Sequence, residues 1–115
     1  MDIRIVAQPI PFSAVAEAAA AQFGDMVKAV VDIDRGVMAL GGELHADAEA
    51  ALLEDGSRQE HLWGINLYPA KPEAERVEFD SMINIRPSQG NRSRGVDDPG
   101  TREAVLKTVG RLIIA

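Results

Sequence analysis

Residues 77–101 read VEFDSMINIRPSQGNRSRGVDDPGT, a stretch that leads from a predicted strand through a polar loop to the start of a helix. Asp98 before Pro99 is typical of a helix start, because the carboxylate accepts from free backbone N–H groups and proline suits the first turn. Residues 86–94 contain three arginines and no acid, so this loop carries +3 while the rest of the chain carries −9. A cationic loop on an acidic protein is the strongest candidate for a binding site.

The size and composition of the chain indicate one globular domain. Its 115 residues, of which 46% are hydrophobic and 26% charged, suffice for a single core, so we predict one domain over residues 1–115. A net charge of −6 argues against wrapping of nucleic acid and leaves only local contact through the loop. Because the sequence contains no cysteine, disulfides and thiol chemistry are excluded.

The N-terminal sequence MDIRIVAQPIPF has neither the basic segment nor the long apolar core of a signal peptide. No apolar run approaches the roughly 18 residues of a membrane span. We therefore expect a soluble cytoplasmic protein that has no membrane partner.

Strand and helix signals alternate in the first forty residues. Apolar residues with a period of two indicate strands, and apolar residues at helical spacing indicate a helix. The predicted elements are a strand near residues 3–7, a helix over residues 12–23, and a hairpin with strands 26–33 and 37–40 joined by the turn Asp34-Arg35-Gly36.

The segment ELHADAE places acidic or imidazole side chains at every other position, namely Glu43, His45, Asp47 and Glu49. On a strand these four side chains would share one face and could bind a metal. The following residues, AEAALLEDG, are typical of a helix that stops at Gly56, so we expect the helix to begin between His45 and Asp47. No metal is assigned, and Glu43 and His45 are candidates for the edge of a site.

Two antiparallel strands are predicted before the arginine-rich loop, over residues 61–68 and 77–86. In the first strand, Trp63, Ile65 and Leu67 share one face, which indicates the core side. We expect the polar side chains of the two strands to lie together on the opposite face, away from the core. These residues are Asn66, Tyr68, Asp80, Asn84 and Arg86.

Guanidinium groups bind carboxylates and phosphates through two parallel hydrogen bonds. We therefore predict that the loop binds a small anionic or phosphorylated ligand, with turnover left open. The predicted ligand-binding residues are Arg86, Gln89, Asn91, Arg92 and Arg94, and the residues expected to support them are Glu43, His45, Asn66, Asp80 and Asn84.

Three alternatives remain open for the same loop. It could be a surface network of ion pairs with nearby acids, a protein- or RNA-interaction module, or part of a structural domain without a ligand. The low aromatic content of 4% weighs against single-strand binding by base stacking. Because the P-loop, GxSxG and HExxH signatures are absent from the sequence, we assign no catalytic residue and no cofactor, and enzymatic activity and oligomeric state stay open.

The strings GELHADAE, LWGINLYP and FDSMINIRPSQGNRSR resemble an uncharacterised bacterial family, domain-of-unknown-function family 5674. The resemblance extends from the predicted strand at residues 26–33 to the final helix. It implies a single small domain and assigns no activity to any residue.

The predicted elements run in the order β-α-β-β-α-β-β-α. This order is typical of an α+β fold, here with two layers, in which a mostly antiparallel sheet of about five strands carries the helices on one face.

Overall fold

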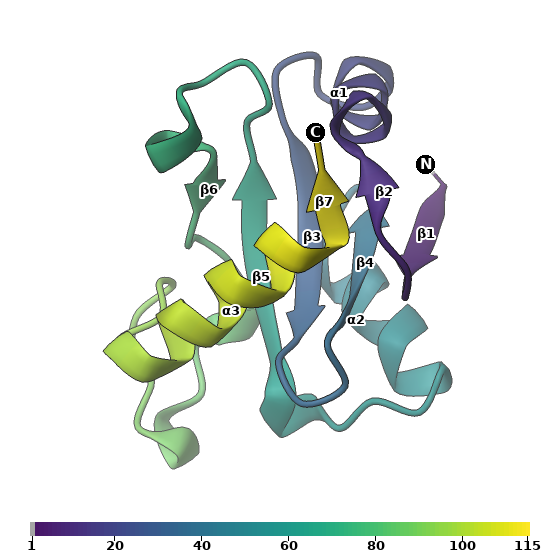
Figure 1. Cartoon of the computed structure of the whole chain (residues 1–115). Helices are drawn as coiled ribbons and strands as arrows, with labels where there is room; N and C mark the ends of the chain where they lie inside the picture. Colours follow the sequence, from purple (N-terminus) through teal and green to yellow (C-terminus); the bar gives the residue numbers. More distant parts are fainter. Residues whose placement is uncertain (1) are drawn as a thin grey trace.

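A five-stranded antiparallel sheet forms the centre of the structure, a computed structural model that describes residues 2–115 (Figure 1). The strands lie in the order β1-β4-β3-β5-β6, so β3 is central and β1 and β6 form the edges. Each neighbouring pair is antiparallel. The bounds are Ile3–Val6 for β1, Val27–Asp32 for β3, Val37–Gly41 for β4, Leu62–Leu67 for β5 and Val77–Glu78 for β6.

Helices cover both faces of this sheet (Figure 1). α1 (Phe12–Ala21) and α3 (Pro99–Leu112) pack on one face, and α2 (His45–Glu54) packs on the other against β1, β3 and β4. The α+β class, the antiparallel sheet and the predicted order of elements are confirmed. The expected placement of the helices on a single face needs correction. Strands β4 and β5 are buried along their whole lengths, so both of their faces need a cover.

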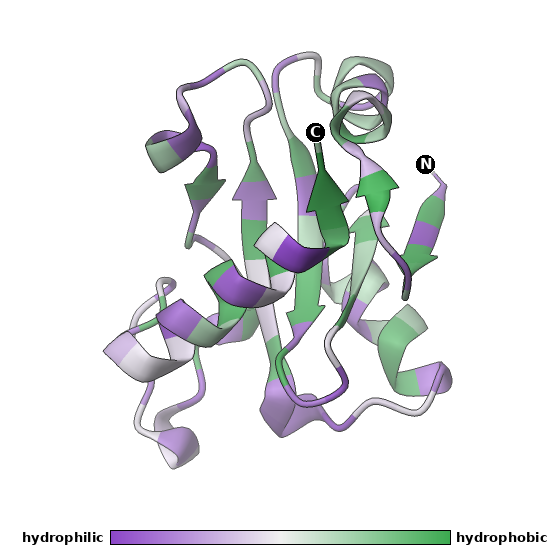
Figure 2. Ribbon diagram, in the orientation of Figure 1, coloured by the Kyte–Doolittle hydropathy of each residue, from purple (hydrophilic) through white to green (hydrophobic). Residues whose placement is uncertain are grey.

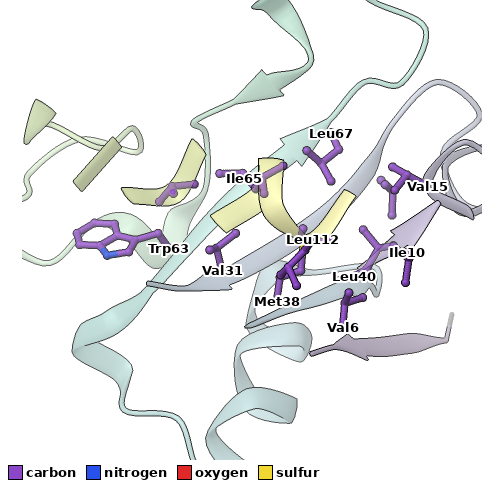
Figure 3. Packing of buried hydrophobic residues seen from close by; sticks show 14 of the residues in the cluster. Val6, Ile10, Val15, Val31, Met38, Leu40, Trp63, Ile65, Leu67 and Leu112 are labelled. Atoms are coloured by element: carbon purple, nitrogen blue, oxygen red, sulfur yellow. The ribbon is translucent and has the colours of Figure 1, made fainter. Parts of the chain in front are cut away.

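Two hydrophobic cores result, one on each side of the sheet. Ala29 and Val31 of β3 point into the larger core under α1 and α3, whereas Val30 between them points into the smaller core under α2. Figure 3 shows the larger core, with Trp63 at one end and Val6 toward the other. In the ribbon coloured by hydropathy, green concentrates on the central strands and purple on the connecting loops (Figure 2).

The hairpin between β3 and β4 is confirmed, and a buried carboxylate closes its turn. Oδ1 of Asp32 accepts hydrogen bonds from the backbone N–H groups of Asp34 and Arg35, each at 2.9 Å. Gly36 follows with φ of +68°, a conformation that glycine adopts without strain. The predicted turn therefore fixes the pairing of the two central strands.

A second, two-stranded sheet was not predicted. β2 (Ile10–Pro11) pairs in parallel with β7 (Ile113–Ile114), which directly follows α3. Each strand has only two residues, so the sequence contains no periodic signal for them. Ile10 is buried in the larger core, and the pair thereby fastens the end of α3 beside the start of α1.

The expected strand over residues 77–86 is wrong beyond its first two residues. β6 ends at Glu78, and two 3₁₀ turns follow, Met82–Asn84 and Pro87–Gln89. The side chain of Asn84 is fully buried, so it does not share a solvent-facing side with Asp80 as expected. A hydrogen-bonding role for this side chain accounts for the difference.

The amide of Asn84 takes the place of a neighbouring strand beside β5. Its Oδ1 accepts from the N–H of Gly64 at 2.8 Å, and its Nδ2 donates to the carbonyl oxygen of the same residue at 3.0 Å. Nη2 of Arg86 donates to the carbonyl oxygen of Leu62 at 2.6 Å, and Nη1 donates to that of Gln59. Side chains therefore satisfy the edge of β5 where β6 no longer reaches it.

Candidate binding cleft

A polar cleft of about 570 Å³ lies on the α2 side of the sheet, beside the N-terminus of that helix. Its wall is built from β3, β5 and β6, the start of α2 and the segment that follows β6. The polar residues that line it are Lys28, His45, Asn66, Tyr68, Glu78, Asp80, Ser81 and Arg94. This concentration of different polar groups makes it the strongest candidate site in residues 2–115.

His45, the first residue of α2, is buried in the cleft wall. Its Nε2 lies 2.8 Å from the carbonyl oxygen of Ile65. Burial of the ring lowers the pKa of His45, and nearby Lys28 lowers it further, although the bond to Ile65 and the carboxylate of Asp80 act in the opposite direction. The neutral imidazole is therefore favoured.

Close contact around Gly64 positions this histidine. A side-chain Cβ at Gly64 would lie 2.5 Å from Cβ of Ser81 and 3.2 Å from Cδ2 of His45. Such distances are shorter than carbon atoms tolerate, so only glycine allows both side chains to approach β5. Ser81 is held in turn by its N–H, which donates to the carbonyl oxygen of Arg94 at 2.9 Å.

Asn66 and Tyr68 share a carboxylate on the neighbouring strand. Nδ2 of Asn66 donates to Oε1 of Glu78 at 2.8 Å, and the hydroxyl of Tyr68 donates to the same oxygen at 3.2 Å. Partial burial and the charge of Glu78 raise the pKa of Tyr68. The Oδ1 atom of Asn66 is buried and has no hydrogen-bond partner within residues 2–115. A buried acceptor without a donor is unfavourable, and it is one mark of a binding site.

Two cations and two carboxylates set the charge of the cleft. Nε of Arg94 lies 2.6 Å from Oδ1 of Asp80, and both side chains are about half exposed. An ion pair with this exposure adds little stability, roughly 0–1 kcal/mol, so it can exchange for a ligand at small cost. Lys28 and Glu78 also line the cleft.

The N-terminus of α2 opens into the same space. Leu44 is the N-cap residue, and no side chain accepts from the first backbone N–H groups. Leu44 and Ala46 line the cleft, so the positive end of the helix dipole adds to its two cations, although Asp47 in the first turn offsets part of it. Leu44 and Met82 are exposed and give the opening an apolar rim.

Four of the predicted residues come together in the cleft: His45, Asn66, Asp80 and Arg94. Of the three arginines of the loop, Arg94 shares the cleft with His45, whereas Arg86 and Arg92 do not line it. The binding role of these residues stays a prediction. Lys28 and Ser81 were missed, because a single lysine in a β-prone segment and a serine beside a turn carry no distinctive signal.

The structure gives different surroundings to the other predicted loop residues. Arg86 bonds to backbone carbonyls at the end of β5, and its guanidinium stacks 4.2 Å from the ring centre of Trp63. Gln89 donates to the carbonyl oxygen of Glu60 at 3.0 Å. The side chain of Arg92 is exposed and has no hydrogen-bond or ion-pair partner within residues 2–115. The three arginines of the loop therefore do not face one common point.

Asn91 is buried and holds the loop together from inside. Its Nδ2 donates to the carbonyl oxygens of Asn84 at 2.7 Å and Gly95 at 2.9 Å, and its Oδ1 accepts from the N–H of Asp97 at 2.8 Å. Its side chain is fully occupied by the loop backbone. Glu43, the remaining predicted residue, is exposed and does not line the cleft.

Other features of the described residues offer less chemistry. A hollow of about 270 Å³ between α1, α3 and the end of β5 is largely apolar. In residues 2–115 there is no cluster of three or more histidines or acids that could hold a metal ion. Over the same range no helix is both long and apolar enough to cross a membrane.

The sheet, its two helical covers and this cleft define a small α+β fold with a candidate site beside α2. A second cleft of about 520 Å³, lined by Gln89, Asn91, Asp97 and Asp98 among others, lies at the other end of the arginine-rich loop and holds no cation among its lining residues. The chain belongs to the family described as Protein of unknown function (DUF5674), which matches residues 4–112. The resemblance seen in the sequence is thereby confirmed, and it extends further toward the N-terminus, into β1. Comparison with curated proteins and comparison with solved structures each gave no match.

Proposed function

We propose that this protein binds a small organic anion in the cleft beside the start of α2. The observation that carries the proposal is the convergence of Lys28, Arg94 and an uncapped helix N-terminus on one concave space. Cations and free backbone N–H groups at a helix start both attract carboxylate and phosphate.

Arg94 is well suited to hold an anion. Its Nε pairs with Asp80, and its two Nη groups have no hydrogen-bond partner within residues 2–115. Its backbone is fixed, because the carbonyl oxygen accepts from the N–H of Ser81 and from Nδ2 of Asn84 at 2.9 Å each. A guanidinium on a rigid backbone loses less conformational freedom when it binds.

The proposed ligand is an anion, as predicted from the sequence, but its proposed site includes only Arg94, at one end of the arginine-rich loop. A local basic patch for protein or RNA has less support, because Arg86 is directed at backbone carbonyls and Arg94 at Asp80. Among the three arginines, this leaves Arg92 as the cation without a partner in residues 2–115.

Thermal melts and calorimetry with inorganic phosphate, citrate and gluconate test the proposal. A ligand that binds the folded state at about 100 times its Kd stabilises the protein by about 2.7 kcal/mol. We expect Arg94→Gln and Lys28→Gln each to weaken binding about tenfold or more, as lost charge-assisted hydrogen bonds do.

Arg92→Gln is the matched control, because it removes the same charge from the same loop outside the cleft. Equal losses in Arg92→Gln and Arg94→Gln would point to unspecific charge attraction and overturn the cleft assignment. Absence of binding by every anion would overturn the proposed function. Binding of RNA with affinity that falls steeply with salt would favour the interaction-module alternative instead.

A further inference from the structure

We infer that the anion bound in this cleft is polyhydroxylated, of the sugar-acid or sugar-phosphate class, and that one hydroxyl donates a hydrogen bond to Nδ1 of His45. The inference rests on the proposed function and names its ligand class. It follows from the tautomer of His45 and from the distribution of donors and acceptors around the cleft.

The tautomer follows from one contact. The carbonyl oxygen of Ile65 can only accept, so the Nε2 atom of His45, 2.8 Å away, must carry the proton. In the neutral ring Nδ1 then bears a lone pair and acts as an acceptor. Nδ1 has no hydrogen bond of normal geometry within residues 2–115, although the residue is buried and lines the cleft. The side chain of Asn66 faces the ring, but it acts as an acceptor there and cannot donate to the lone pair of the neutral imidazole.

Further acceptors lie on the same wall. Glu78 and Asp80 contribute carboxylates, which accept from hydroxyls. At pH 7.5 an alkyl phosphate or a plain carboxylate brings mainly oxygen acceptors and would leave these groups unmatched. Hydroxyl groups donate, so they fit this wall.

Donors occupy the other part of the lining. Lys28, Arg94 and the start of α2 suit a negative group, whereas the histidine and the carboxylates suit hydroxyls. A ligand that satisfies both parts has an anionic group attached to a hydroxylated carbon chain. The cleft volume of about 570 Å³ falls within the range of roughly 300–1,000 Å³ that is usual for small-ligand sites.

Pairs of probes that differ only in their hydroxyl groups separate this inference from simple anion binding. The pairs are gluconate against hexanoate for the carboxylates, and glycerol 3-phosphate against propyl phosphate for the phosphates. For at least one pair we expect the hydroxylated member to bind about tenfold or more tightly in calorimetry at pH 7.5. The pair with the larger ratio identifies which anionic group the cleft takes.

His45→Leu is the informative variant, because it removes the imidazole lone pair and offers no hydrogen-bond acceptor in its place. We expect this variant to keep its affinity for the plain anion and to reduce the ratio between hydroxylated and plain probes to near one. Gln89→Glu, at the far end of the loop and outside the cleft lining, should leave the ratio unchanged.

Acidification gives an independent measurement on the unmodified protein, in case the variant does not fold. Protonation of His45 turns Nδ1 into a donor, so the hydroxyl preference should fall. Lys28 and Arg94 also face the cleft, and they act on both members of a probe pair alike. Glu78 and Asp80 accept from hydroxyls as His45 does, so the acidification is stopped at about pH 5.5, above the usual carboxyl range of about 4.

The outcomes distinguish the two proposals. If plain and hydroxylated anions bind equally, or if His45→Leu keeps the preference, the polyhydroxylated ligand class is overturned and anion binding stands. If no anion binds at all, both proposals are overturned.

Discussion

The side-chain amide of Asn84 forms two hydrogen bonds with the backbone of Gly64, accepting at 2.8 Å and donating at 3.0 Å. It thus supplies to β5 the same donor and acceptor that another strand would supply. A third bond, from Nδ2 to the carbonyl oxygen of Arg94 at 2.9 Å, connects this edge to the loop that delivers Arg94 to the cleft. The sheet and the candidate site are therefore linked through one buried amide.

Replacement of Asn84 by alanine should destabilise the fold by about 2–4 kcal/mol, because the buried N–H and carbonyl of Gly64 lose their partners together. Urea denaturation measures this change. Ser88→Ala in the same segment is the control and should shift stability by less than about 0.5 kcal/mol, since Ser88 is exposed. Equal stability of the two variants would contradict the role assigned to Asn84.

Gly64→Ala should destabilise the protein by about 1–3 kcal/mol, because the added Cβ would overlap Cβ of Ser81 at 2.5 Å. Combining it with Ser81→Gly should recover part of this loss, and a double-mutant cycle measures the coupling. Gly110→Ala in α3 is the contrasting control. No atom lies within 4 Å of a Cβ at Gly110, so alanine there should be neutral or stabilising by up to about 1 kcal/mol.

Arg86→Ala should lower stability by about 1–3 kcal/mol, since it removes both the hydrogen bond to the Leu62 carbonyl and the stacking on Trp63. Trp63 is the only tryptophan, so its fluorescence reports both the local change and the unfolding transition. Arg92→Ala, with the same charge change, should stay within about 0.5 kcal/mol of the natural protein. A comparable loss in both variants would indicate a general charge effect instead.

The stability of the protein should decrease as the pH falls below about 6.5. Burial lowers the pKa of His45 in the folded state, whereas in the unfolded chain it stays near 6.5. The unfolded chain therefore binds a proton first, and stability is lost from about 6.5 down to the folded pKa.

Urea titrations between pH 7.5 and the lower limit of reversible folding measure this effect, and His45→Gln should flatten it. The other histidine is present in both proteins and cancels in the comparison. The carboxylates of Asp97 and Asp98 act in a separate window. Hydrogen bonds from Ser93 and Thr101, respectively, lower their pKa values, so their contribution is lost only as the pH falls below about 3.8. An unchanged pH slope in His45→Gln would contradict the buried, neutral histidine.

Local patterns predicted most of the elements correctly. Helical periodicity located α1, α2 and α3, and Asp98 caps α3 as expected, accepting from the N–H of Thr101 at 2.8 Å. The alternation over residues 77–86 was misleading. The sequence pattern does not distinguish a polar side chain that faces solvent from one that is buried and hydrogen-bonded, and Asn84 is fully buried. Alternation also does not say how many layers cover a sheet, so the position of α2 on the opposite face was not foreseen.

The candidate site was predictable only in part, for a related reason. Strand pairing places Asn66 beside Glu78 on the α2 side, and the helix start places His45 in the same wall, so these positions follow from register. Asp80 lies beyond the end of β6, so its place in the cleft depends on the segment that follows the strand. Whether the guanidinium group of an arginine in this loop faces the cleft or bonds to a backbone carbonyl depends on the loop conformation, which the sequence pattern does not predict. Arg86 and Arg94 look alike in the sequence, yet one bonds to the edge of β5 and the other lines the cleft.

The buried amide of Asn91 has a kinetic consequence for the cleft. It joins residues on both sides of the loop, with bonds to the backbone of Asn84, Gly95 and Asp97, and its own backbone pairs with Arg86. These contacts cannot break one at a time without exposing a buried polar group, so the loop should open as a single cooperative unit. Amide hydrogens across the loop would then exchange at a common slow rate, although it contains only two single 3₁₀ turns. A loop of this kind is already ordered before a ligand arrives, so the backbone entropy of positioning Arg94 is lost during folding, and binding has to fix only its side chain.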